Sequence, residues 1–94
     1  MTTNYQKGYR MERLACKDLE ALGWRTVRTA GSHGPFDVIA WKRDSFLFVQ
    51  IKNAQVSPKV KAEILDELRE LPRLPGVRYE LWERGNHAWF VSEA

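Results

Sequence analysis

Two β-rich runs separated by only three residues constrain this fold more than any other feature of the sequence. Residues 36–42 (FDVIAWK) and 46–52 (FLFVQIK) are rich in aromatic and β-branched side chains, which favour strands. A short turn can join antiparallel strands, whereas parallel strands need a connection of about a dozen residues or more. We therefore predict an antiparallel β-hairpin that turns at residues 43–45.

The rest of the sequence predicts two helices and three further strands around this hairpin. Gly23 ends the first helix and Pro58 opens the second, because glycine suits a helix end and proline a first turn. The order α-β-β-β-α-β-β predicts one mixed α/β domain over residues 1–94, with helices flanking a sheet. Helices are expected over residues 8–22 and 58–71, strands over residues 24–28, 77–83 and 88–91, a loop over residues 29–35, and a turn at Gly85 and Asn86.

Composition places the chain among small folded domains. With 94 residues, 44% of them hydrophobic, the chain can form one thin core. Chains of this size often gain stability by forming oligomers. No apolar run is long enough to cross a membrane, and the N-terminal MTTNYQKGYRMER lacks the apolar segment of a secretory signal. We therefore expect a cytoplasmic protein without a membrane partner.

The charge balance is mildly basic, with 15 Lys and Arg residues against 12 Asp and Glu and a formal net charge of +3. Such a balance favours a polyanionic partner without establishing one. Any single basic side chain is more often a solvated surface charge than a contact to a ligand. As a set, the candidates for phosphate contacts are Lys7, Arg10, Arg13, Arg25, Arg28, Lys42, Lys59 and Lys61.

The predicted hairpin brings three polar side chains to one end of the sheet. Side chains alternate between the faces of a strand, so Gln50 and Lys52 share a face near the end of one strand, and Asp37 begins the other. If Asp37 shares that face, an acid, an amide oxygen and an ammonium group converge at the sheet edge. Taken alone, Asp37 is more simply a turn acid, and Lys52 is a solvated strand end.

A carboxylate lies among apolar positions of the first predicted helix. Glu12, Cys16 and Leu19 fall on one helical face by the i, i+4, i+7 rule. Burying an unpaired charge is costly, which indicates that Glu12 pairs with a metal or a base. The simpler alternative is a surface ion pair with Arg10 or Lys7. Cys16 is the only cysteine, so it forms no disulfide within the chain and indicates no zinc cluster; a small core residue is its simplest role.

Four motifs in the first half of the chain carry a family resemblance. KGYRMER at residues 7–13 resembles the Lys-Gly-x-x-x-Glu-Arg opening of archaeal-type Holliday junction resolvases, which are nucleases of the PD-(D/E)xK superfamily. Arg28 and then GSHG at residues 31–34 resemble the arginine and the serine-bearing loop of that family.

The other two motifs lie in the predicted hairpin. FDVIA at residues 36–40 resembles the Asp-Val/Ile-Ala strand of the family, and VQIK at residues 49–52 stands where the family usually has Glu-x-Lys. The motifs agree in order and spacing from Lys7 to Asn53, with no comparable motif after that. The chain is identified by this resemblance as a short member of the family.

The resemblance implies a restriction-endonuclease-like core and a metal-dependent endonuclease. It implies a homodimer that resolves four-way DNA junctions by paired phosphodiester hydrolysis, with no small-molecule cofactor. The implied cofactor is Mg²⁺, for which Mn²⁺ can substitute. The implied metal ligands are Glu12, Asp37, Gln50 and the backbone carbonyl of Ile51.

The resemblance also assigns catalytic and binding roles. Lys52 would orient or help deprotonate the attacking water, or stabilise charge on the phosphorane, and the Ser32 hydroxyl would bind a phosphate oxygen. Taken singly, Ser32 and His33 are more simply ordinary loop residues. The implied catalytic residues are Glu12, Ser32, Asp37, Gln50 and Lys52, and the implied nucleic-acid contacts are Lys7, Arg10, Arg13, Arg28 and His33.

Gln50 departs from the pattern of the family. A neutral amide in place of a carboxylate makes the ligand set less negative by one charge, so we expect weaker Mg²⁺ binding. Some nucleases of this superfamily carry Gln-x-Lys, so the departure is compatible with activity.

The two C-terminal strands carry aromatic side chains on both faces. If one face is solvated, Trp82 and Trp89 are exposed and mark a subunit interface. The alternative is that the second helix or a chain terminus covers both rings.

Three other functions stay open from the sequence. The chain could be a different PD-(D/E)xK nuclease, of nicking, repair or restriction type, or a non-catalytic DNA-binding module with the same fold. A small protein-interaction domain would make the motif match accidental.

Overall fold

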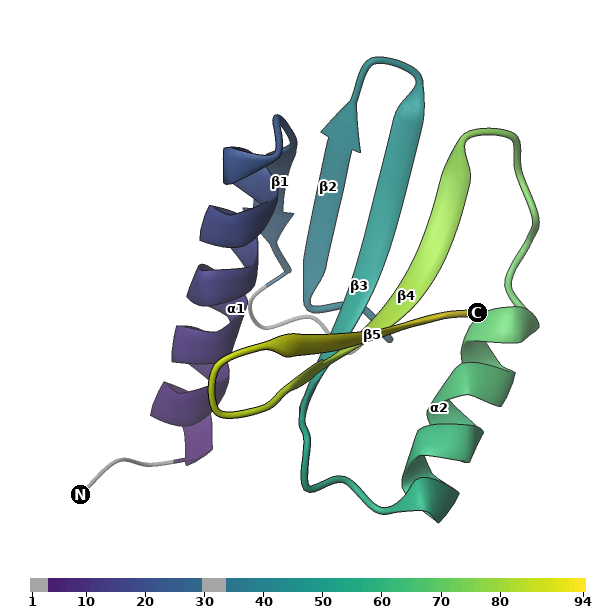
Figure 1. The fold of residues 1–94 in the computed structure, drawn as a ribbon. Helices are drawn as coiled ribbons and strands as arrows, with labels where there is room; N and C mark the ends of the chain where they lie inside the picture. The colour runs from purple at the N-terminus through teal and green to yellow at the C-terminus, as the bar shows by residue number, and fades with distance from the viewer. Residues whose placement is uncertain (1–3, 30–33) are drawn as a thin grey trace.

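The predicted hairpin forms the middle of a mixed five-stranded sheet in the computed structural model, which describes residues 4–29 and 34–94. The strands lie in chain order, β1-β2-β3-β4-β5 (Figure 1). All neighbouring pairs are antiparallel except β3 and β4, which are parallel. The elements are α1 (Asn4–Ala21), β1 (Arg25–Arg28), β2 (Val38–Lys42), β3 (Ser45–Asn53), α2 (Pro58–Arg69), β4 (Val77–Arg84) and β5 (Trp89–Glu93). The predicted order and fold class are confirmed.

Helix α2 is the crossover that the parallel pair requires. It begins as predicted, with Pro58 in its first turn and Ser57 as the N-cap, whose hydroxyl accepts a hydrogen bond from the Val60 amide at 3.2 Å. Helix α1 and helix α2 lie on opposite sides of the molecule, α1 beside β1 and β2 and α2 beyond β4 (Figure 1).

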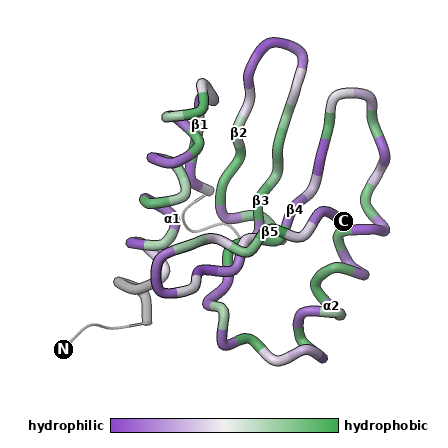
Figure 2. Tube along the Cα trace, viewed as in Figure 1, coloured by the Kyte–Doolittle hydropathy of each residue, from purple (hydrophilic) through white to green (hydrophobic). Residues whose placement is uncertain are grey.

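The main core lies between α1 and one face of the sheet, the α1 face. Ala15, Cys16 and Leu19 of α1 are buried there together with every second residue of β2 and β3. The predicted role of Cys16 as a core residue is confirmed, at 8% exposure. Figure 2 shows the hydrophobic colour along β2 and β3 and the hydrophilic turn between them. The strand residues of this core are Val38, Ala40, Leu47, Val49, Ile51 and Trp82.

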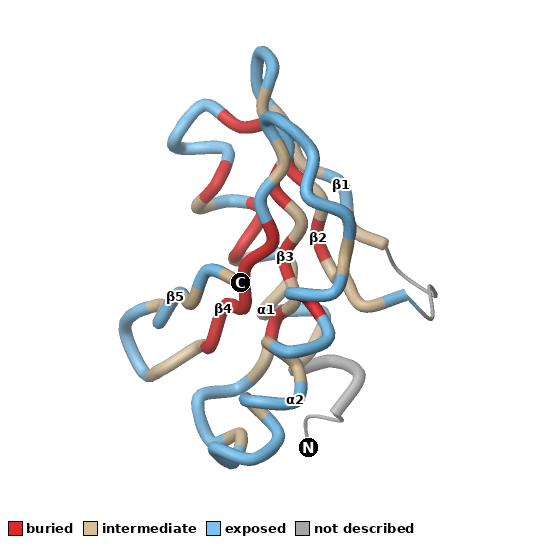
Figure 3. Tube along the Cα trace, turned by 90° about the vertical axis from the view of Figure 1, so that its right-hand side faces the viewer, coloured by how far each residue is buried: buried red, intermediate tan, exposed pale blue. Residues whose placement is uncertain are grey.

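The opposite face of the sheet, the α2 face, is covered mainly over β4. Two contacts place α2 and the segment after it on this face: Lys61 pairs with Glu83, and the Tyr79 hydroxyl donates to the Pro72 carbonyl at 2.8 Å. Tyr79 also joins Phe36 and Phe48 in an aromatic cluster with ring centroids 5.0 to 5.7 Å apart. Because helices and loops cover both of its faces, β4 is buried without a break from residue 79 to residue 83 (Figure 3).

Several predicted boundaries differ from the structure. Helix α1 begins at Asn4 rather than residue 8, and α2 ends at Arg69. Strand β2 begins at Val38, because the alternating pattern of residues 36–42 includes two residues that precede the backbone ladder. The predicted Gly85-Asn86 turn is a longer connection, closed by a 2.9 Å hydrogen bond from the Gly85 amide to the Ala88 carbonyl. Within the described residues, no helix is long and apolar enough to span a membrane.

The prediction that Trp82 and Trp89 form an exposed patch is wrong. Trp82 is only 7% exposed and belongs to the core under α1. The two rings lie 5.3 Å apart, and the Trp89 indole N–H donates to Asp18 of α1 at 2.8 Å. The covering element is thus α1, not α2, because α1 extends across the sheet as far as β5. Trp82 is therefore not available as a subunit interface, and Trp89 is half-buried against α1.

Candidate functional site

Asp37 lies where the pairing of β2 with β3 ends, and its side chain continues that pairing. The Asp37 amide donates to the Val49 carbonyl at 2.8 Å. The next donor along β3, the Ile51 amide, is bound at 2.8 Å by Oδ2 of the Asp37 carboxylate. A side chain thus accepts the hydrogen bond that a further strand residue would otherwise accept, which fixes the carboxylate against the backbone of β3.

The register of the hairpin brings Gln50 and Lys52 to the side of Asp37. Val38 pairs with Val49, whose carbonyl also accepts from the Asp37 amide, so Asp37 lies beside Gln50, the next residue of β3, which is on the α2 face. Lys52 follows on the same face and is close enough to lower the pKa of Asp37 by its charge. The predicted arrangement of an acid, an amide and an ammonium group at one end of the sheet is thus present, although their roles stay predictions.

Burial raises the pKa of Asp37 above its ordinary value. The hydrogen bond from Ile51 and the charge of Lys52 act in the opposite direction but do not cancel the effect of burial. The hydrogen bond from Ile51 and the charge of Lys52 therefore do not fully offset the burial of the ionised carboxylate. A cation bound beside Asp37 would favour this ionised form.

The backbone of Ile51 supplies a second oxygen on this side of β3. Residues two apart in a strand direct their carbonyl groups the same way, and the Val49 carbonyl points towards Asp37. The Ile51 carbonyl therefore points to the same side of β3 as the Val49 carbonyl. It lies beyond the end of β2, on the side of β3 where the Asp37 carboxylate binds the Ile51 amide.

Glu12 is held by an arginine rather than left free. Its Oε1 lies 3.1 Å from Nε of Arg28 in β1, and the Arg28 guanidinium stacks over the Tyr9 ring at 4.3 Å. The alternative of an ion pair is confirmed in kind: among the described side chains the partner is Arg28 rather than Arg10, and the side chain of Lys7 lies outside the described part of the chain. Because Arg28 neutralises Glu12, any ligand of Glu12 must compete with this pair.

The metal set predicted from the sequence can be tested against these positions. In residues 4–29 and 34–94, no three His, Cys, Asp or Glu side chains gather into a metal-binding group. The set contains only two acids, Glu12 and Asp37, so its other oxygens must come from Gln50 and Ile51. Hard, neutral and anionic oxygens of this kind fit Mg²⁺, which keeps several waters. The chemistry of the residues around Asp37 therefore fits the ion, and Asp37 would be its charged ligand.

The predicted contacts to nucleic acid are placed only in part. Arg10 and Arg13 are exposed on α1, and Arg13 lines a groove of about 720 Å³ between α1 and β1, together with Lys17 and Arg28. Ser32, His33 and the side chain of Lys7 lie outside the described part of the chain. The loop that carries Ser32 and His33 leaves β1 beside the site, since the Thr29 amide donates to the Asp37 carbonyl at 3.1 Å.

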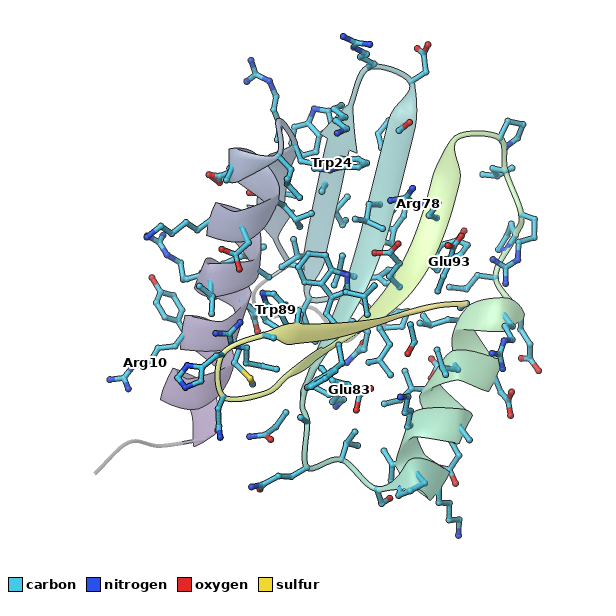
Figure 4. All side chains as sticks on the ribbon, in the orientation of Figure 1. Arg10, Trp24, Arg78, Glu83, Trp89 and Glu93 are labelled. Atoms are coloured by element: carbon cyan, nitrogen blue, oxygen red, sulfur yellow. The ribbon has the colours of Figure 1, made fainter. Side chains whose placement is uncertain are left out.

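Glu83 is a site-proximal acid that sequence reasoning missed. It is 6% exposed, pairs with Lys52 in the register of β3 and β4, and lies 2.8 Å from Nζ of Lys61. Figure 4 shows Glu83 near the end of β3 and β4, towards α2. The alternation of side chains along β4 could have identified Glu83 from the sequence. Glu83 shares its strand face with Tyr79 and Leu81, so it is an acid among apolar residues.

Comparison with known proteins agrees with the resemblance seen in residues 7–53. The family model for the archaeal Holliday junction resolvase (Hjc) matches residues 3–87. The solved structure of Hjc from Archaeoglobus fulgidus, a Holliday junction resolvase from an archaeal hyperthermophile, has a similar fold with a TM-score of 0.64. The two sequences are 23% identical, and the match covers 93% of this chain and 72% of that one. No curated protein matches the chain.

We expect Asp37→Asn to stabilise the metal-free protein in a pH-dependent way. Because burial raises the pKa of Asp37, the folded state holds a proton that the unfolded chain releases at lower pH. Wild-type stability should therefore fall as the pH rises through the folded-state pKa, whereas the amide cannot ionise. The advantage of Asp37→Asn should be small near about pH 3.5 and full at about pH 7.

Urea unfolding at both pH values, without divalent metal, measures this difference. Asp66→Asn is the control, because Asp66 is an exposed acid of α2. An advantage of Asp37→Asn that is equal at the two pH values would contradict the effect of burial.

Proposed function

The chain belongs to the archaeal Holliday junction resolvase (Hjc) family, and we propose that it is a metal-dependent endonuclease that resolves four-way DNA junctions. One observation carries the proposal: the Asp37 carboxylate, bound to the Ile51 amide, lies beside Gln50 and Lys52 at one end of the sheet. A DNA substrate and a lone cysteine without a disulfide both suit the cytoplasm, where we expect the protein to act.

The cofactor of the proposed reaction is Mg²⁺, with Mn²⁺ as a substitute. Asp37 is its charged ligand, and the Gln50 side chain and the Ile51 carbonyl provide neutral oxygens. Glu12 would join them once its carboxylate is released from Arg28. When bound, the ion supplies positive charge against the scissile phosphate and makes a water molecule more acidic.

The protein positions the reacting groups through its own contacts. The hydrogen bond from Ile51 keeps the Asp37 carboxylate in one orientation, so little reorganisation is needed during the reaction. Lys52 is close enough to Asp37 to lower its pKa, and in this proposal its ammonium orients the attacking water or stabilises the phosphorane. Ser32 binds a phosphate oxygen in this proposal.

Basic side chains beside the site hold the DNA backbone. Arg10 and Arg13 project from α1, and Lys7 and His33 join them in this proposal. Arg28 has a second use, because the pair with Glu12 breaks when a phosphate binds the guanidinium. Binding of DNA would then leave Glu12 free to act as a ligand.

A non-catalytic DNA-binding module is the second candidate. Two observations favour it: Gln50 carries no charge, and Glu12 is already paired with Arg28. Both reduce the negative charge that attracts a divalent cation. Cleavage of a four-way junction, a matched duplex and a flap, each with and without Mg²⁺, separates a resolvase from other nucleases and from this module.

The proposed active form is a homodimer, because resolving a junction needs two nicks and this domain holds one candidate site. The surface that we propose for the interface is the part of the α2 face over β1 to β3. Val27 is 48% exposed there and Phe46 45%, and Ile39 and Trp41 are half-buried beside them. Apolar and aromatic side chains of this kind are enriched in the cores of homodimer interfaces.

We expect Asp37→Asn to abolish junction cleavage and leave junction binding nearly unchanged. Replacing residues that only support a metal ligand costs about 10–100-fold in affinity or activity, so a direct ligand should cost more than about a hundredfold in rate. Binding depends mainly on basic residues. Single-turnover cleavage and gel-shift titration test both points, and cutting at the wild-type rate would exclude Asp37 as a ligand.

Gln50→Glu is expected to lower the Mg²⁺ concentration for half-maximal cleavage by about tenfold, since a carboxylate attracts a hard cation better than an amide does. Metal titrations of the wild type and the variant measure the shift. An unchanged or higher Mg²⁺ requirement would count against ligation by residue 50.

Phe46→Ser should convert the dimer to a monomer at micromolar concentration, because it removes an exposed ring from the proposed interface. Phe90→Ser is the matched control, as Phe90 is a 58% exposed phenylalanine on β5. Analytical ultracentrifugation distinguishes the two states. A monomeric wild type that makes paired nicks would exclude the dimer, and a dimeric Phe46→Ser variant would exclude this interface.

A further inference from the structure

Two buried acids lie on β4, and they differ in how they are satisfied. Glu80 and Glu83 are 7% and 6% exposed, and they are the only buried charged side chains within the described part of the chain. Glu80 faces α1, accepts a hydrogen bond from the Trp82 indole at 2.9 Å, and has Arg78 at 3.6 Å. Glu83 faces the opposite way, towards α2.

Glu83 has an ion-pair partner but incomplete hydrogen bonding. The Lys61 ammonium lies 2.8 Å from Oε1 of Glu83, and no other group among the described residues donates a hydrogen bond to that oxygen. The buried carboxylate can therefore accept a further donor.

Lys52 is the residue of β3 that pairs with Glu83. The two residues pair in the parallel register of β3 and β4 and point to the same face. Side chains at paired positions of neighbouring strands lie about 5 Å apart at their bases, within reach of a lysine. On its other side, Lys52 acts on the charge of Asp37. The charges thus alternate in sign from Asp37 through Lys52 and Glu83 to Lys61.

We propose that Glu83 is a positioning residue that holds the Lys52 ammonium in place for the reaction, and that Lys61 anchors Glu83 from α2. The inference rests on the proposed nuclease function. A lysine side chain has about 2 kcal/mol of rotamer entropy. An ammonium group that acts at one position in the site must therefore be held in one conformation by neighbouring groups. An acid at position 50 would provide it from the neighbouring position on the same strand face, but Gln50 is neutral. Glu83 supplies the second carboxylate from the next strand.

The test compares Glu83→Gln with Glu80→Gln. Both changes remove one charge from an acid of almost equal burial on the same strand, and they differ in the face that is affected. Urea unfolding shows whether both variants fold. Glu83→Asp keeps the charge on a shorter side chain and is the variant for partial rescue.

Two measurements report on Lys52, one on the reactivity of its amine and one on its role in cleavage. The first is the rate at which trace acetic anhydride acylates the Lys52 amine, measured by mass spectrometry on the whole chain without DNA or metal. A lysine held between carboxylates reacts slowly, so Glu83→Gln should accelerate acylation of Lys52 about threefold or more. The second is junction cleavage under single-turnover conditions at saturating Mg²⁺, together with the Kd for the junction.

We expect Glu83→Gln to lower the cleavage rate about tenfold while the junction Kd and the Mg²⁺ requirement stay within about twofold of wild type. Glu83→Asp should lie between the two, and Glu80→Gln should match the wild type in acylation and cleavage. If the effect came only from removing a buried charge from β4, acylation and cleavage would instead change alike in both Gln variants.

Each contrary result overturns a defined part of the proposal. Equal acylation of Lys52 in the two Gln variants would show that Glu83 does not hold Lys52. A raised Mg²⁺ requirement in Glu83→Gln would make Glu83 a metal ligand instead. A wild type that cuts no junction would remove the proposed function, and the catalytic role of Glu83 with it, while the acylation rates would still decide whether Glu83 contacts Lys52.

Discussion

The pairing of β2 with β3 is the constraint on which the rest of this structure depends. β3 is the middle strand of the sheet. It pairs with the antiparallel β2 on one side and with the parallel β4 on the other, so its register determines how both halves of the sheet are aligned. One face of β3 buries Val49 and Ile51 under α1, and the other presents Gln50 and Lys52. A slip of one residue would exchange these faces, placing a lysine in the core. The core beneath α1 therefore fixes the register that builds the candidate site.

Local patterns in the sequence were sufficient for this part of the molecule. The hairpin, the start of α2 at Pro58 and the shared end of Asp37 and Lys52 all follow from strand alternation and turn chemistry. The start of β2 did not follow from them, because alternation continues through Asp37 while the backbone ladder stops at Val38. The difference has a chemical cause: the Asp37 carboxylate occupies the Ile51 amide that another residue of the ladder would have bound.

The parts that the sequence could not predict depend on contacts between distant segments. Trp89 is covered because its indole reaches Asp18, which lies 71 residues away in the chain. Glu12 pairs with Arg28 across the first two elements rather than with a neighbour on its own helix. In β4, burial on both faces removes the alternation of apolar and polar residues that marks a half-exposed strand, so the distinct surroundings of Glu80 and Glu83 become visible only after α1 and α2 are placed.

The charge of the site links metal binding to stability. Burial raises the pKa of Asp37, so keeping its carboxylate ionised at neutral pH works against the folded state. A divalent cation that binds only the folded chain compensates that charge and stabilises the fold by mass action. A carboxylate at position 50 would strengthen the attraction for the cation, but it would add a second acid beside Asp37 and raise the cost of the metal-free site. In the proposed site, Gln50 would avoid that cost and bind the ion more weakly, and the restraint of Lys52 would then depend more on other residues, such as Glu83.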